Sequence, residues 1–94
     1  MLIDNISMDK DEVRIFKNYL TSDLKYYKSG IDILNKLENA KDNVEFSKII
    51  EDNNLPSDWT PEDVTIRKTN TIKLVGVLEN VITSINYKIA IENM

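Results

Sequence analysis

Four adjacent polar residues near the expected start of the last helix have the side chains that an anion site needs. Arg67, Lys68, Thr69 and Asn70 offer two cations and two small hydrogen-bonding groups within about one helical turn. Such groups near a helix N-terminus suit a phosphate or a carboxylate. The alternative is an exposed polar stretch in front of an apolar stripe.

A second cationic feature is a row of polar residues at spacings of three and four along the first long helix. The row consists of Lys10, Arg14, Lys17, Thr21, Lys25 and Lys28. Cations beside tyrosines could hold phosphates and stack bases. A solvated flank, with lysine stems covering the edge of the core, explains the same pattern. The candidate ligand-binding residues are Lys25, Tyr26, Tyr27, Lys28, Arg67, Lys68, Thr69 and Asn70.

The composition argues against most catalytic chemistry. The 94 residues include no histidine and no cysteine, so the commonest general base, thiol nucleophile and transition-metal ligands are missing. Two glycines cannot form a Gly-rich phosphate loop. The paired carboxylates show no metal-loop spacing, and we interpret them as helix caps and solvated surface. We expect no catalytic residue, no metal ligand and no cofactor, and therefore no enzyme.

The formal net charge of −4 is concentrated in the middle of the chain. Residues 38–63 contain eight acidic and two basic residues. An acidic protein is not expected to bind a nucleic-acid polymer, although this acidic segment could engage a basic partner protein. No apolar run approaches the roughly 20 residues that span a bilayer, and the N-terminus does not resemble a signal peptide. We expect a cytoplasmic protein, located in the host cytoplasm if a phage encodes it.

The spacing of apolar residues predicts a first helix over about 8–41. Ser7 is the expected N-cap, and acidic residues follow it in the first turn. Apolar residues then recur at helical spacing and define one face. These are Val13, Phe16, Leu20, Leu24, Tyr27, Ile31, Leu34 and Leu37.

Two further helices are expected after a break at Asp42. A short helix covers about 44–53, and a loop at 54–60 carries Leu55 and Trp59 as a hydrophobic plug. Thr60-Pro61-Glu62-Asp63 is a helix-start signal that predicts a last helix over about 61–92. The alternative for residues 64–75 is a β-hairpin, which lacks the usual turn residues.

These elements predict a single all-α domain, 1–94. Two long helices form an antiparallel hairpin with a short connecting helix, and oligomerisation completes a helical bundle, as a dimer or a higher ring. The apolar stripe of the last helix is the expected oligomer interface. It comprises Leu74, Val75, Leu78, Val81, Ile82 and Ile85.

Parts of the chain resemble a family of small phage proteins that counter CBASS defence by sequestering cyclic oligonucleotides. KSGIDILNKL, from Lys28 to Leu37, is similar to a pattern in the first helix of that family, and SDW followed by RKTN resembles the start of its last helix. Asn70 stands where the family has an acid. The resemblance implies a compact oligomer in which Lys68 and Thr69 hold the phosphates of a cyclic ligand at a subunit interface. It also implies binding without turnover.

Two classes of function fit these features. The first is a non-enzymatic helical binding protein of a phage or mobile element, which sequesters a signalling nucleotide or a host protein. The second is a protein–protein adaptor, inhibitor or assembly subunit that uses its apolar seam and acidic segment. Convergence of the cationic residues on one pocket favours sequestration of a nucleotide. An extended, exposed apolar surface favours the adaptor.

Overall fold

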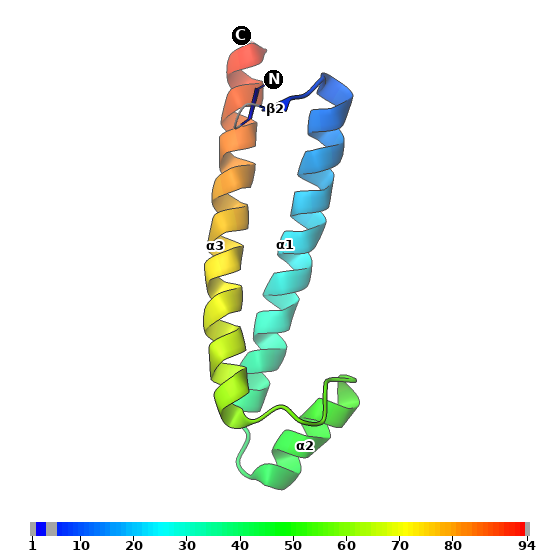
Figure 1. The fold of residues 1–94 in the computed structure, drawn as a ribbon, viewed down its shortest axis with the longest axis vertical. Helices are drawn as coiled ribbons and strands as arrows, with labels where there is room; N and C mark the ends of the chain where they lie inside the picture. Colours follow the sequence, from blue (N-terminus) through cyan, green and yellow to red (C-terminus); the bar gives the residue numbers. More distant parts are fainter. Residues whose placement is uncertain (1, 4–5, 94) are drawn as a thin grey trace.

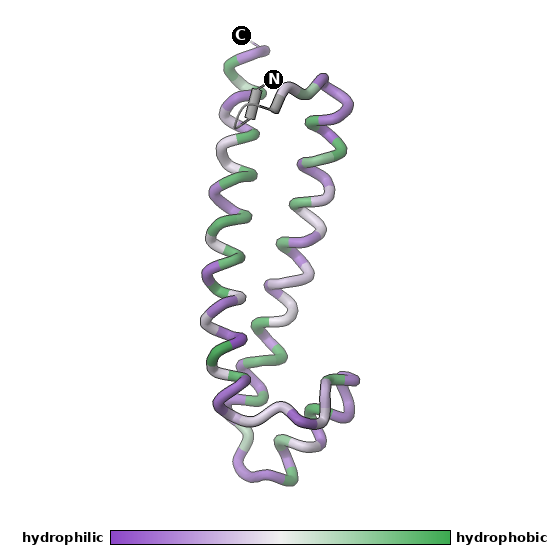
Figure 2. Tube along the Cα trace, in the orientation of Figure 1, coloured by the Kyte–Doolittle hydropathy of each residue, from purple (hydrophilic) through white to green (hydrophobic). Residues whose placement is uncertain are grey.

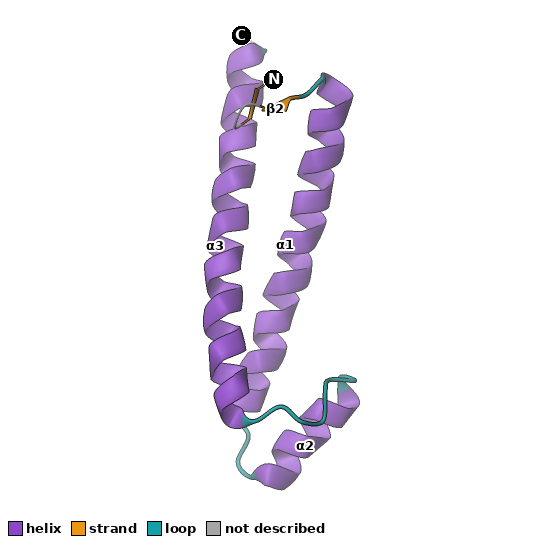
Figure 3. Cartoon of the chain, viewed as in Figure 1, coloured by secondary structure: helices purple, strands orange, loops and turns teal. Residues whose placement is uncertain are grey.

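The computed structural model describes residues 2–3 and 6–93, most of which are helical. Helices α1 (Lys10–Glu38) and α3 (Pro61–Glu92) lie side by side and run in opposite directions, and α2 (Asn43–Asp52) lies at one end of the pair (Figure 1, Figure 3). Two short strands, β1 (Leu2–Ile3) and β2 (Ile6–Ser7), pair antiparallel near the other end. The all-α prediction is confirmed. The finer prediction, a hairpin that completes a bundle by oligomerisation, stays a prediction.

The start of α1 differs from the expected one. Asp9 is the N-cap: its Oδ1 accepts from the Glu12 backbone N–H at 2.8 Å, and the Glu12 carboxylate accepts from the Asp9 backbone N–H at 3.2 Å. Ser7 lies in β2 and cannot form this capping box, because Lys10 follows it three residues later. The expected N-cap at Ser7 is therefore wrong. The helix also ends earlier than expected, at Glu38 with Asn39 as the C-cap.

The caps of α2 and α3 lie where the sequence indicates. Asp42 caps α2 by accepting from the Glu45 backbone N–H at 2.8 Å. Thr60 caps α3, and Asp63 accepts from the Thr60 backbone N–H at 2.9 Å to complete a capping box. The helix then continues without a break, so the alternative hairpin over residues 64–75 is wrong.

The clearest hydrophobic core lies at the α2 end of the helix pair. Leu34 and Leu37 of α1, Ile50 of α2 and Val64 of α3 are buried together. Leu55 and Trp59, from the loop between α2 and α3, pack against this core, as expected for a hydrophobic plug. Farther along the pair, Val13, Val75, Leu78 and Ile85 are also buried.

Apolar and polar residues alternate along helix α3, as Figure 2 shows. Among the residues that the structure describes, it is the one helix long and apolar enough to cross a membrane. One such helix is weak evidence of a membrane span; α3 packs along α1, and 11% of its most apolar window is buried in the single chain.

Candidate binding surface

A small cavity near the α2 end brings three of the predicted site residues together. Tyr26 and Tyr27 of α1 meet edge to face with ring centroids 5.4 Å apart. The Arg67 guanidinium lies 4.4 Å from the centroid of the Trp59 ring, within range of a cation–π interaction. The cavity has a volume of about 260 Å³, and we call it the aromatic pocket. It is lined by Tyr26, Tyr27, Ser29, Gly30, Ile33, Leu34, Leu55, Trp59, Arg67 and Thr71.

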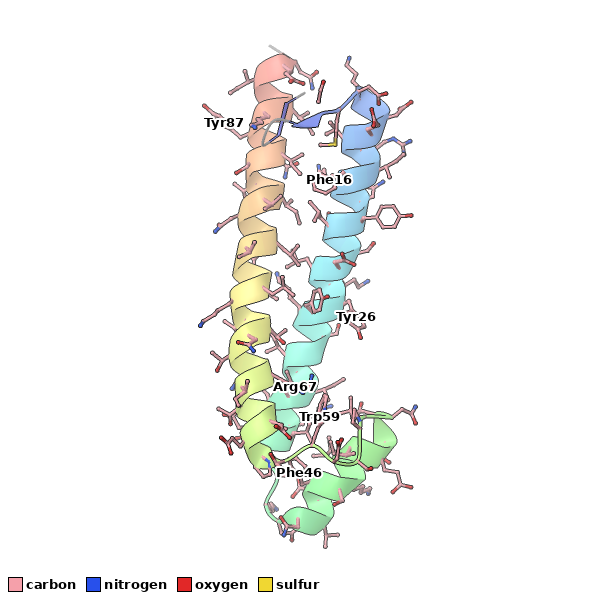
Figure 4. All side chains as sticks on the ribbon, viewed as in Figure 1. Phe16, Tyr26, Phe46, Trp59, Arg67 and Tyr87 are labelled. Atoms are coloured by element: carbon pink, nitrogen blue, oxygen red, sulfur yellow. The ribbon has the colours of Figure 1, made fainter. Side chains whose placement is uncertain are left out.

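Local structure places the Trp59 ring beside α3. Asn54 has a positive φ of 54°, which turns the chain after α2, and the Leu55 backbone N–H donates to the Ile50 carbonyl at 3.0 Å. The Trp59 backbone N–H donates to the Pro56 carbonyl at 3.4 Å, immediately before the Thr60 cap. Arg67 lies two turns into the capped helix and reaches back over the ring. Figure 4 shows the two side chains next to each other at this end.

The predicted cations do not converge on the aromatic pocket. Lys68 pairs with Glu38 at 3.4 Å, and Lys28 pairs with Glu79 at 3.8 Å. Both pairs bridge α1 and α3, and neither lysine lines the pocket. Successive helical residues point about 100° apart, so the neighbour of Arg67 in sequence lies on another side of α3.

The remaining predicted ligand-binding residues also lie outside the pocket. Lys25, Thr69 and Asn70 are exposed. The Thr69 hydroxyl donates to the Thr65 carbonyl at 3.0 Å, so it is satisfied within α3. Of the eight residues that the sequence indicated, the structure gathers Tyr26, Tyr27 and Arg67. Trp59 was expected to be a core plug, and its second role beside Arg67 was not foreseen.

Exposed apolar side chains continue from the aromatic pocket along the helix pair. On α1, Tyr26 is 73% exposed, and Tyr19, about two helical turns before it, is 68% exposed. On α3, Leu74 follows Arg67 by two turns, and Val77 is one turn farther on and 57% exposed. We call this surface the apolar face. It consists of Ile15, Phe16, Tyr19 and Tyr26 of α1 and Ile66, Leu74 and Val77 of α3.

The residues of the expected oligomer interface differ in their burial within the single chain. Val75, Leu78 and Ile85 are buried within the single chain, so they belong to its own core. Val81 and Ile82 are half-buried, and Leu74 is exposed. The wide stripe of α3 is thus divided, because its centre packs against the chain itself and its flank stays accessible.

Asp9 and Asp63 take part in the capping boxes of α1 and α3. Hydrogen bonds from the Thr60 backbone and side chain lower the pKa of Asp63, and the nearby Arg67 charge lowers it further. A hydrogen bond from the Glu12 backbone N–H is the main cause of the lowered pKa of Asp9. Within the described part of the chain, no group of three or more acidic side chains is arranged to hold a metal ion.

Comparison with known proteins gives no family to which the geometry can be referred. No protein-family model, no curated protein and no solved structure matches this chain.

Proposed function

We propose that this chain is a non-enzymatic protein-binding module that self-associates through its apolar face. Self-association would complete the helical bundle from two-helix hairpins, and the assembly would act as an adaptor, inhibitor or assembly subunit in the cytoplasm. The observation that carries this proposal is the apolar face, which extends along both long helices outside the core.

The surface of the single chain is larger than a compact monomer needs. Its accessible surface is 7160 Å², whereas a compact monomer of 10.9 kDa exposes about 5,600 Å². Its radius of gyration is 17.9 Å, against about 12 Å for a compact domain of 94 residues. The excess of about 1,600 Å² on one chain is about twice the roughly 800 Å² that each partner buries in a standard protein–protein interface. These dimensions support a chain that buries more surface by association.

The two sides of the helix pair differ in a way that supports the apolar face as the interface. The opposite side carries the inter-helix ion pairs Lys28–Glu79 and Lys68–Glu38, whose partners are exposed or half-exposed. A partner that covered these charges would have to remove water from them. By contrast, covering the large apolar side chains of the apolar face releases water from them, which is favourable.

The molar mass in solution tests the proposal. We expect the wild-type chain to be a dimer or larger, and Val77→Glu to dissociate it, because an unpaired carboxylate would be buried in the interface. Ile72→Glu is the matched control. Ile72 is also about half exposed, on the same helix, but one turn from Lys68 on the ion-paired side.

Size-exclusion chromatography with light scattering, over a wide range of protein concentration, gives the masses. Circular dichroism checks that both variants stay helical. A monomeric wild type, or a Val77→Glu variant that keeps the wild-type mass, contradicts self-association through this face.

A second candidate function is sequestration of a small anionic ligand, such as a cyclic oligonucleotide, in the aromatic pocket. The specific observation is the Arg67 guanidinium over the Trp59 ring, in a pocket that Tyr26 and Tyr27 also line. Rings of this kind stack bases, and an arginine can hold a phosphate. Lys68, to which the family resemblance assigns phosphate binding, would first have to leave Glu38.

A further inference from the structure

A larger cavity lies at the far end of the helix pair, where α1 begins and α3 ends. Its volume is about 650 Å³, within the range of pockets that hold small organic molecules. We call it the far-end cavity. Met8, Asp9, Lys10, Val13, Arg14, Lys17, Asn18, Ile89, Glu92 and Asn93 line it. None of these residues belongs to the apolar face, so a ligand here is independent of the proposed function.

Three cations of the predicted basic row form one wall of the far-end cavity. Lys10, Arg14 and Lys17 lie at spacings of four and three residues, about 6 Å and 4.5 Å along the helix axis. Among the described residues, none of the three has a carboxylate within ion-pair distance, unlike Lys28 and Lys68 of the same chain. Within the part of the chain that the structure describes, the positive charge of this wall is therefore not paired with a carboxylate.

Two acidic residues also line the far-end cavity. The Asp9 carboxylate is already engaged, because it caps α1 and accepts from the Glu12 backbone N–H. Glu92 lies on α3, near its end, and has interactions of its own. Among the described lining residues, three cations stand against these two acids, so the balance of charge favours an anionic group.

The rest of the cavity wall includes apolar side chains. Val13 is buried and lies on the same helix as the cations. Ile89 is half-buried and faces it from α3, with Met8 at the edge. A lining that combines cations with aliphatic side chains fits a molecule with an anionic group and a hydrocarbon part.

We infer that the far-end cavity binds a phosphate-bearing amphiphile. Its phosphate monoester contacts Lys10, Arg14 and Lys17, and its hydrocarbon part packs on Val13 and Ile89. A phosphate monoester fits better than a carboxylate, because it carries close to two negative charges and offers three acceptor oxygens. The planar guanidinium of Arg14 can hold two of those oxygens at once.

Dodecyl phosphate below its critical micelle concentration is the probe, with binding measured by isothermal titration calorimetry on the full chain. We expect saturable binding of one molecule per chain. The double variant Arg14→Gln/Lys17→Gln should bind at least about tenfold more weakly, because each cation provides charge-assisted hydrogen bonds. The control Lys25→Gln/Lys36→Gln removes the same charge from α1 outside the cavity and should bind like wild type.

Three further probes test whether a phosphate alone, a hydrocarbon chain alone or a membrane surface accounts for the binding. Tripolyphosphate and neutral dodecyl maltoside should each bind much more weakly than dodecyl phosphate, because each offers half of the recognition. Equal affinity of either one, or equal affinities of the two double variants, overturns the inference. Vesicles that contain phosphatidic acid test a membrane surface. Flotation of the protein with them, lost in Arg14→Gln/Lys17→Gln, would assign the cations to a bilayer headgroup and overturn a monomeric ligand.

Discussion

The packing of Ile85 offers a sharp test of the far half of the helix pair. Ile85 is 1% exposed and lies in the C-terminal half of α3. Ile85→Val removes one buried methylene and should cost about 1 kcal/mol, within the usual 0.5–1.5 kcal/mol for this change. In a domain of this size, that loss lowers the melting temperature by roughly 4–8 °C.

The control for this prediction is the same deletion at Ile72, which is 49% exposed on the same helix. Ile72→Val should change the free energy of unfolding by less than about 0.5 kcal/mol. Thermal unfolding followed by circular dichroism, at one fixed protein concentration, measures both variants. Equal losses of stability in Ile85→Val and Ile72→Val would refute the assignment of Ile85 to the core and of Ile72 to the exposed surface. They would mean that the ion-paired side is covered or that Ile85 is not packed.

Two further predictions concern the aromatic pocket and the α3 cap. If the pocket holds a cyclic oligonucleotide, one member of a panel of cyclic di- and trinucleotides should raise the melting temperature and change Trp59 fluorescence. Arg67→Gln should remove both effects. A panel in which no nucleotide shifts the melting temperature counts against that function. The folded-state pKa of Asp63 is lowered below its ordinary value of 3.8, so its contribution to stability is complete above that pH and is lost as the pH falls through the lower folded value. Asp63→Asn should therefore flatten the loss of stability on acidification in thermal melts, and an unchanged acid profile in this variant would contradict the cap's role.

Local signals in the sequence predicted the helices well. Thr60 and Asp63 form the expected capping box, because a capping box depends only on residues three apart. The β-branched residues of IRKTNTIKLVG did not produce a strand, since the cap and the apolar period both favour a helix over the same residues. The start of α1 was missed by two residues, because Ser7 and Asp9 are both good caps and only Asp9 has an acid three residues later.

The candidate site was harder to predict, because adjacency in sequence is not adjacency on a helix. Arg67 and Lys68 appeared to be one cationic cluster, yet Arg67 lies over Trp59 and Lys68 lies on the side that faces Glu38. The Trp59 contact depends on how the loop after Asn54 folds back, which no local pattern specifies. Similarly, a wide apolar stripe does not reveal which of its residues meet the chain's own α1, so buried Leu78 and exposed Leu74 could not be told apart from the sequence.

The placement of charge on the helix pair has a consequence for how the proposed activities could coexist. The cations of the far-end cavity lie on the helix side near Lys28, since Lys10, Arg14, Lys17 and Lys28 follow one another at helical spacing. The apolar face lies on the opposite side, with Tyr26 and Leu74. Association through the apolar face would therefore leave the far-end cavity open to solvent. It would instead cover the mouth of the aromatic pocket, because Tyr26 belongs to both surfaces. A ligand in the aromatic pocket should then change the self-association constant, whereas a ligand in the far-end cavity should not. These two outcomes separate the sites without any knowledge of the natural ligand.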